Sequence, residues 1–260
     1  GIELESYGWL DWLKVFLVAP KQIITNWERY DYFITEMGID SPYPPKNMEY
    51  LLRIIQPKIG VLTNINLEHS VYFEPLAKAQ EELARKEEIL ELTARQEQLL
   101  LKSIDESGRS IVNLDDQIIA SLLPLRSKTM TISEKAKNAD FYIVSAKIEN
   151  GTFIVKFIFL NDSYIVVIPQ VLPKSYTTTI IMALAIAFSC QISIKDATAL
   201  FSNNFSLPPG RFGVFNGIKN SLILDSSYNS SLEPAVGALN ALLDVAGNRR
   251  KVAILGDMRE

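Results

Sequence analysis

The chain has 260 residues, with 26 basic and 30 acidic side chains and a net charge of −4 at pH 7. Its single cysteine and single histidine exclude a disulfide framework and a zinc site built from several cysteine or histidine ligands. The mildly acidic balance argues against nucleic acid or a membrane surface as the main partner.

The most apolar run, residues 180–188, is shorter than the roughly 20 residues that cross a bilayer, and it predicts a buried core helix. The start of the chain shows no basic segment and no small-residue cleavage site. With one cysteine, which suits a reducing compartment, these features lead us to expect a cytoplasmic protein, and a monomer. Because the sequence lacks an initiator methionine, we also expect it to be a fragment.

Short apolar runs alternate with helical patterns over the first half of the chain. This alternation predicts an α/β fold with a mainly parallel sheet and flanking helices. We expect strands at 32–35, 59–63 and 109–113, and helices at 47–55, 75–103 and 115–122.

The pattern changes after Asp140, where three alternating runs predict a small antiparallel meander. Asn150-Gly151 is a strong hairpin signal between the first two runs. The strands are expected at 141–149, 152–160 and 163–168.

Two more helices and a proline-rich break follow the meander, and the break at 207–210 predicts a linker. In chain order we expect helices at 177–189 and 194–203, strands at 213–215 and 221–224, a helix at 231–245 and a strand at 251–255.

Polar side chains follow two of the expected strands. Glu36 comes directly after 32–35, and Asn64 and His69 follow 59–63. The carboxyl ends of parallel strands meet at one edge of a sheet, where such sheets bind ligands. We therefore expect a site there, with a plain loop carboxylate and a structural histidine as the alternatives at Glu36 and His69.

Lys86 falls on the apolar stripe of the long helix expected at 75–103. The stripe consists of Leu76, Ala79, Leu83 and Leu90. A lysine there extends its amine to solvent, pairs with acids, or is chemically changed. Partial burial lowers the pKa of the amine, and a neutral amine takes up carbon dioxide as a carbamate, which binds metal.

A second strand-to-helix loop, Asp225 to Asn229, precedes the helix expected from Ser231. Ser230 and Glu233 have the spacing of a capping box. A helix N-terminus favours an anion or a nucleotide, and a capped turn without a ligand is the alternative. No G-x-x-x-x-G-K-[ST] motif occurs, so a phosphate-binding loop of that type is not in these residues.

Together these segments resemble the Mur ligases, which add amino acids or dipeptides to the peptidoglycan precursor. Residues 36–69 resemble the central ATPase domain of that family, and Asn113 to Asp116 is similar to its N-x-D-D segment. Gly210-Arg211, the 225–229 loop and the 255–258 segment look like the opening of its C-terminal domain. The order and spacing of the motifs, from about Tyr32 to Glu260, carry the resemblance.

The resemblance implies a site for ATP and Mg²⁺. Glu36, His69 and Lys86 match the magnesium-binding residues, with Lys86 carbamylated, and Lys86 and His69 are also the implied catalytic residues. Lys78 is the competitor for the lysine role, but it lies off the apolar stripe. The residues implied to hold the nucleotide are Asn64, Arg211, Asp225, Tyr228 and Asn229; Ser226 replaces a second acid that the family often has there.

The resemblance also divides the chain into residues 1–207, an incomplete central ATP-binding domain, and residues 208–260, the start of a Rossmann-like C-terminal domain. The sequences of residues 227–229 and 255–258 are most similar to those of the family member that joins D-alanyl-D-alanine to UDP-N-acetylmuramoyl-tripeptide through an acyl phosphate. We expect the phosphate-binding loop before Gly1, and the 260 residues alone to be inactive. The alternatives are another Mur ligase, a ligase like folylpolyglutamate synthetase, or a non-catalytic binding module without that loop.

Overall fold

The computed structural model divides the chain into two units, Gly1–Met37 and Gly38–Glu260. The residues that it describes are 8–25, 30–68, 70–228 and 231–257. None of the helices in these ranges is long and apolar enough to cross a membrane.

The described residues of the first unit contain one helix, α1 (Trp9–Thr25), which the sequence analysis did not predict. The strand expected at 32–35 is wrong, because the segment is irregular and Phe33 and Ile34 are exposed. Aromatic and β-branched residues favour a strand only where a neighbour accepts their backbone hydrogen bonds and packs on them. No strand in the described part of the chain pairs with this segment.

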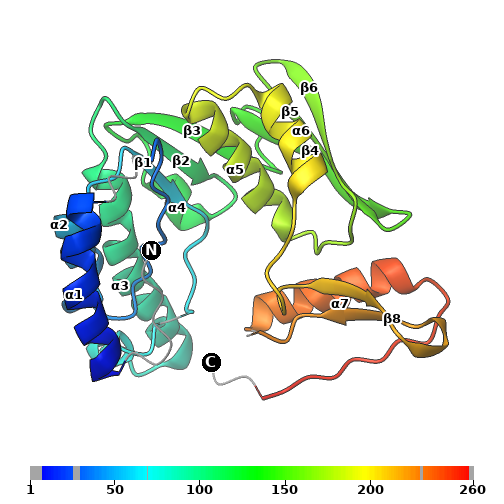
Figure 1. Cartoon of the computed structure of the whole chain (residues 1–260), viewed down its shortest axis with the longest axis horizontal. Helices are drawn as coiled ribbons and strands as arrows, with labels where there is room; N and C mark the ends of the chain where they lie inside the picture. Colours follow the sequence, from blue (N-terminus) through cyan, green and yellow to red (C-terminus); the bar gives the residue numbers. More distant parts are fainter. Residues whose placement is uncertain (1–7, 26–29, 69, 229–230, 258–260) are drawn as a thin grey trace. The chain divides into compact units, whose positions relative to one another are not determined.

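The second unit is built on a six-stranded sheet whose strands follow one another in chain order (Figure 1). The first four strands pair in parallel and the last three antiparallel, which confirms a mainly parallel sheet. The strands are β1 (Ile59–Leu62), β2 (Arg109–Asn113), β3 (Lys128–Ser133), β4 (Phe141–Glu149), β5 (Thr152–Phe159) and β6 (Asp162–Ile168).

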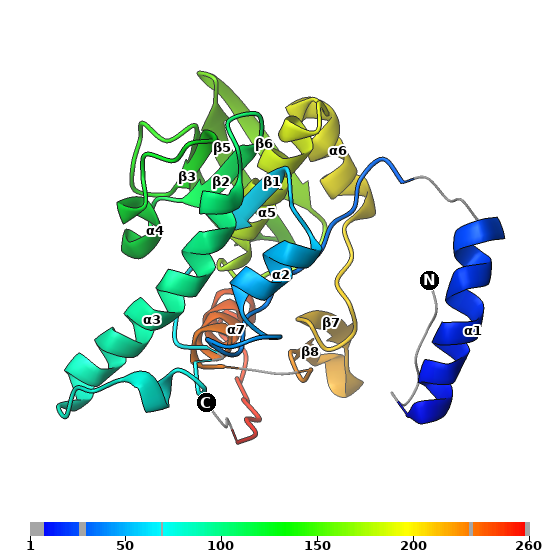
Figure 2. The ribbon, with the colours of Figure 1, turned by 90° about the vertical axis from the view of Figure 1, so that its left-hand side faces the viewer.

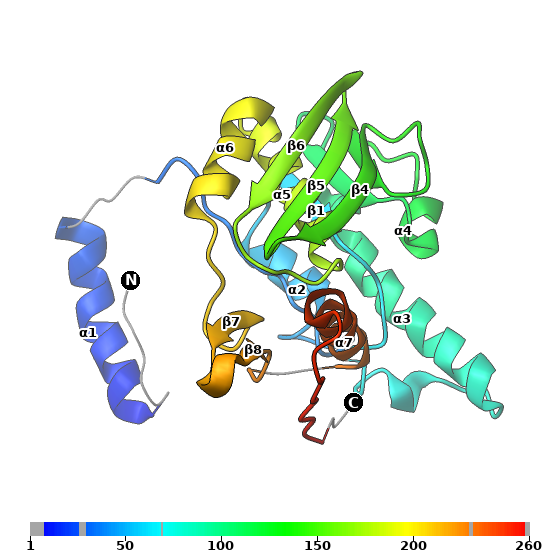
Figure 3. The same ribbon diagram turned by 90° about the vertical axis from the view of Figure 1, so that its right-hand side faces the viewer.

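The meander is confirmed, but it continues the main sheet. Strand β3 was not predicted, and it pairs in parallel with both β2 and β4, with Ile132 beside Phe141. Figure 3 shows β4, β5 and β6 side by side. Asn150 and Gly151 lie at positive φ in the turn between β4 and β5, as the hairpin signal predicts.

Helices cover both faces of the sheet. Ile111 of β2 packs with α5 and α6, whereas the next residue, Val112, packs with α3 and α4 on the other face. Alternate residues of a strand face opposite sides, so the unit has three layers. The helices are α2 (Met48–Ile54), α3 (Glu82–Ser103), α4 (Gln117–Ser121), α5 (Tyr176–Ser189) and α6 (Ile194–Asn204).

Helix α3 begins later than the sequence predicts. The segment expected as its first two turns forms a short 3-10 helix, Glu74–Leu76, and then an extended stretch. The Glu88 carboxylate accepts the backbone N–H groups of Lys78 and Ala79, and the Glu81 side chain caps the helix. These carboxylates take the backbone donors that an earlier helix start would have used.

The C-terminal segment forms a hairpin and one helix. Phe212, which is buried, packs with Val171 and Ala241 and so connects the segment to the end of the main sheet. The elements are β7 (Gly213–Asn216), a 3-10 turn (Ile218–Asn220), β8 (Leu222–Asp225) and α7 (Leu232–Ala246). The strand expected at 251–255 is wrong: no described strand pairs with it, and Ile254 is 95% exposed.

Candidate functional site

The loop after β2 binds the loop after β1. The Asn113 side-chain amide donates to the Thr63 carbonyl oxygen at 3.0 Å, and the Ile65 backbone N–H donates to the Asp116 carboxylate at 2.8 Å. The second Asp116 oxygen accepts two backbone N–H groups of α4, at 2.9 and 3.0 Å, and caps that helix. The carboxyl ends of β1 and β2 therefore form one edge, held by side chains.

The end of β3 joins the same edge through Asp115. Its carboxylate accepts the Ser133 hydroxyl at 2.5 Å and the Glu134 backbone N–H at 2.7 Å. Burial, and then the charge of Asp115, raise the pKa of the Glu134 carboxyl. In this chain the N-x-D-D segment therefore cross-links three strand ends.

The predicted site residues at this edge lie in different parts of the chain. Asn64 is exposed directly after β1, and its side-chain oxygen accepts the Thr63 hydroxyl at 3.0 Å. Glu36 is exposed in the first unit. His69 lies outside the described residues. Of the three predicted metal ligands, Lys86 is thus the one described within the second unit.

Lys86 is exposed and pairs with an acid, which is one of the alternatives that its place on the apolar stripe left open. Its side chain is 54% exposed and forms an ion pair with Glu82 at 2.7 Å. That hydrogen bond and the charge of Glu82 raise the pKa of the Lys86 amine.

Glu97 is a carboxylate that the sequence analysis missed. Burial, and then the charge of Asp116, raise the pKa of the Glu97 carboxyl to about 7. On the same turn of α3, the side-chain oxygen of Gln96 is buried without a hydrogen-bond partner. The signal was the position of Glu97 between Ala94 and Leu101, at the spacing of one helix face.

The predicted nucleotide residues of the C-terminal segment come together. The Arg211 guanidinium stacks on the Tyr228 ring, 4.3 Å from its centroid. The Tyr228 backbone N–H donates to the Gly210 carbonyl at 3.2 Å, and Asp225 accepts the Ser227 N–H at 3.1 Å. Asn229 lies outside the described residues. The 210–211 turn and the loop after β8 thus form one surface that presents a cation on an aromatic ring.

Gly210 permits this contact, and Gly210→Ala is expected to destabilise the protein by about 2 kcal/mol. Its φ is +74°, where a side chain is strained, and a Cβ would lie 3.0 Å from the Cβ of Tyr228. Gly151→Ala is the matched control, because Gly151 has φ +77° with nothing within 4 Å. Urea denaturation should show about 1 kcal/mol for the control, and equal losses would contradict the close contact.

A side-chain contact connects the loop after β1 to the start of α7. The Ser231 hydroxyl donates to the Glu68 carboxylate, and Ser231 is the residue from which α7 begins. The helix start expected near Ser231 is confirmed. The contact connects the loop that leads to His69 with the helix that follows the 225–229 loop.

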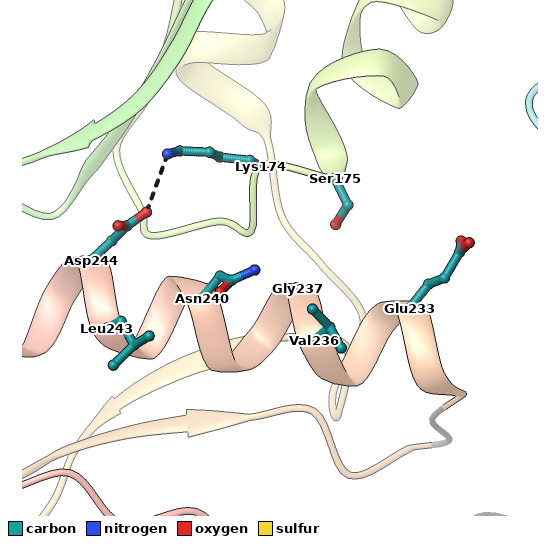
Figure 4. Close-up of a pocket in the computed structure, with 8 residues that line it drawn as sticks. All are labelled: Lys174, Ser175, Glu233, Val236, Gly237, Asn240, Leu243 and Asp244. Carbon is teal, nitrogen blue, oxygen red and sulfur yellow. Dashed lines mark ion pairs between the residues drawn. The ribbon is translucent and has the colours of Figure 1, made fainter. Parts of the chain in front are cut away.

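A cleft of about 420 Å³ lies between α7 and the segment before α5 (Figure 4). Lys174 and Asp244 form an ion pair across it at 3.6 Å. None of the predicted site residues that the structure describes contributes to its wall. The lining residues are Lys174, Ser175, Glu233, Val236, Gly237, Asn240, Leu243 and Asp244.

Comparison with known proteins decides the family. The model of the Mur ligase middle domain matches residues 17–186. The chain belongs to the Mur ligase family. The match includes the sheet edge and Glu97 and ends within α5.

Curated Mur ligases resemble nearly the whole chain. The UDP-N-acetylmuramoyl-tripeptide–D-alanyl-D-alanine ligase of Mycobacterium tuberculosis is 22% identical over 93% of this chain and 45% of its own length. The ligase of the same name from Escherichia coli K12 is also 22% identical, over 93% of this chain and 49% of its own length. This Mur ligase chain spans about half the length of the curated relatives that it matches.

Solved structures share the fold. The MurF ligase of Thermotoga maritima in complex with ADP has a TM-score of 0.65 and 21% identity, over 87% of this chain and 48% of that one. MurF of Acinetobacter baumannii has a TM-score of 0.62 and 16% identity, over 78% and 41%. These likenesses establish the Mur ligase fold.

Proposed function

We propose that the full-length protein is an ATP-dependent ligase that joins D-alanyl-D-alanine to UDP-N-acetylmuramoyl-tripeptide. The observation that carries the proposal is the match of 93% of the chain to ligases named for this reaction. The family match over residues 17–186 supports it. The sequences of residues 227–229 and 255–258 favour the ligase that adds D-alanyl-D-alanine over another Mur ligase or a ligase like folylpolyglutamate synthetase.

The reaction needs activation, because a carboxylate does not react with an amine at neutral pH. The terminal phosphate of ATP is transferred to the substrate carboxylate, giving an acyl phosphate and ADP. The amine of D-alanyl-D-alanine then attacks the acyl carbon, and the amide forms as phosphate leaves. The protein contributes positioning and stabilisation of charge.

We assign nucleotide binding to both sides of the 207–210 break. On one side, Asn64 has its side-chain amide available to the nucleotide at the carboxyl end of β1. On the other side, the Arg211 guanidinium is already oriented by its contact with the Tyr228 ring. A guanidinium held on an aromatic ring loses less conformational freedom when it binds a phosphate. Asp225 and Asn229 complete the proposed set. In this proposal residues 1–207 are the central domain and residues 208–260 begin the C-terminal domain.

Magnesium, when bound, would neutralise phosphate charge, and oxygen ligands suit it. Glu36, in the first unit, and His69, which lies outside the described residues, are two proposed ligands. Lys86 is the third proposed ligand, as a carbamate; its unmodified amine is exposed and paired with Glu82.

The test is phosphate release by the full-length protein from ATP. We expect release only when UDP-N-acetylmuramoyl-tripeptide and D-alanyl-D-alanine are both present. Changing both substrates separates the other ligases of this fold: UDP-N-acetylmuramoyl-L-alanyl-D-glutamate with diaminopimelate tests another Mur ligase, and a folate with glutamate tests a ligase like folylpolyglutamate synthetase. An absence of substrate-dependent release with every amine would contradict the ligase proposal and favour a binding module.

Arg211→Ala is expected to weaken ATP binding about 10- to 100-fold, the loss of one charge-assisted hydrogen bond. Calorimetric titration of the full-length protein with a non-hydrolysable ATP analogue measures this. Arg250→Ala, at an exposed arginine of the same segment, is the control and should bind as the parent does. Equal affinity of the two variants would remove Arg211 from the nucleotide site.

A further inference from the structure

Helix α7 has a glycine in its interior, where glycine weakens a helix relative to alanine. A Cβ at Gly237 would lie 3.2 Å from the Oγ of Ser175 and 3.7 Å from the Cβ of Pro173. The glycine therefore lets the backbone of α7 approach the segment before α5 more closely than a residue with a side chain would. Gly237 marks a contact between the helix and that segment.

Two polar contacts hold the same helix near its ends. At its start, the Ser231 hydroxyl donates to the Glu68 carboxylate, on the loop after β1. Near its other end, Asp244 forms the ion pair with Lys174 at 3.6 Å (Figure 4). Gly237 lies between these contacts, and seven residues, or two turns, place Asp244 on the same side of the helix. Helix α7 is thus held at three levels by residues that precede the 207–210 break.

An apolar contact connects the helix to Arg211. Ala241, one turn after Gly237, is buried and packs with Phe212 and Val171. Phe212 directly follows Arg211 in the sequence. Figure 2 shows α7 below the six-stranded sheet and next to the hairpin of β7 and β8. The position of α7 therefore determines where the segment that carries Arg211 lies relative to the sheet.

We propose that Gly237 and Ser175 are positioning residues, whose contact seats α7 against the segment before α5 and so fixes the spacing of the nucleotide site. This spacing is the distance between Asn64, on the loop after β1, and Arg211. The inference rests on the proposed function, because it concerns the two sides of that site. When the two sides are already held together, the nucleotide does not have to assemble them, and a preorganised site binds more tightly.

The first test locks the contact with a disulfide. A Cβ at Gly237 would lie 4.0 Å from the Cβ of Ser175, and disulfides join Cβ atoms about 3.5–4.5 Å apart. We expect Ser175→Cys/Gly237→Cys to cross-link without nucleotide in the full-length protein whose other cysteines, Cys190 among them, are replaced by alanine. The oxidised variant should bind a non-hydrolysable ATP analogue at least as tightly as its reduced form.

Ser175→Cys/Leu243→Cys is the matched control for the cross-link. Leu243 lines the same cleft, but it is six residues, or roughly 9 Å along the axis, beyond Gly237. This pair should stay reduced under the same conditions.

The second test separates α7 from the segment before α5. Gly237→Leu favours the helix itself and places a side chain against Ser175 and Pro173. We expect the ATP analogue to bind about tenfold more weakly in calorimetric titration, because affinity falls with the fraction of molecules that make the contact. Asn240→Leu adds an apolar side chain to the same cleft and should bind as the parent does.

Gly237→Ala serves if Gly237→Leu fails to fold. Its added carbon would lie 3.2 Å from the Ser175 hydroxyl oxygen, and that hydroxyl does not cap α5. We expect Gly237→Ala to weaken binding of the analogue and Ser175→Ala, which removes the hydroxyl, to restore it in the double variant.

Three results would overturn the proposal: no cross-link between positions 175 and 237, weaker binding in the oxidised variant that reduction restores, or parent affinity in Gly237→Leu. If the parent binds no ATP analogue, the proposed function is wrong and the positioning role is wrong with it. The cross-link then still reports whether α7 makes the contact. Phosphate release reports separately on the reaction, so a protein that binds ATP and releases no phosphate contradicts the ligase reaction alone.

Discussion

Glu97→Gln is expected to stabilise the protein by about 3 kcal/mol at pH 8 and to leave its stability unchanged at pH 4. In the folded protein, burial and then the charge of Asp116 raise the pKa of Glu97 from 4.5 to about 7. Between these values the unfolded chain releases the proton while the folded protein keeps it. Raising the pH therefore favours unfolding, and the full cost is present above pH 7. Glutamine has no proton to release and escapes this cost.

The measurement is urea denaturation at pH 4, 6 and 8 in a buffer free of divalent cations. The difference between Glu97→Gln and the parent protein should grow through this range. Glu91→Gln should follow the parent at every pH, because Glu91 is exposed on the same helix and pairs with Arg95. A constant difference across the range would show that the ionisation of Glu97 does not oppose folding.

Turns and helix faces were predictable because their signals are local. Asn150 and Gly151 occupy the positive-φ positions that their residue types favour, and the strands on either side follow. The inward face of α3 was identified correctly at Leu90, which packs against the core, but not at Leu83, which is 68% exposed. The position of α3 along the sheet was not predicted. The helix begins at Glu82, where Glu81 caps it, and contacts of its C-terminal end with Gly60 fix it against β1.

Strands were less predictable, because a strand depends on its partners. Residues 32–35 and 251–255 have strand composition, yet no described strand pairs with either. Strand β3 was missed although its backbone is paired on both sides. At the candidate site, Arg211 and Tyr228 could be predicted from sequence motifs. The raised pKa of Glu97 could not, because it depends on burial and on the charge of Asp116, which α4 and the loop after β1 hold in place.

Asp116→Ala is expected to destabilise the protein by about 3 kcal/mol. Loss of the cap of α4 accounts for about 1 kcal/mol. The backbone N–H of Ile65, a buried residue, also loses its acceptor, and an unsatisfied buried donor costs about 1–3 kcal/mol. Urea denaturation at pH 5 measures the loss where most Glu97 in the folded protein is still protonated.

Asp116→Asn separates the acceptor from the charge, because an amide keeps one oxygen acceptor and has no negative charge. We expect it to lose less stability than Asp116→Ala at pH 5. At pH 8 it should recover part of that loss, since removing the Asp116 charge removes the second cause of the raised pKa of Glu97. In the Glu97→Gln background this recovery should disappear, because glutamine has no charge to repel. A recovery of equal size in both backgrounds would show that Asp116 acts on stability without Glu97, and the two carboxylates would then be independent.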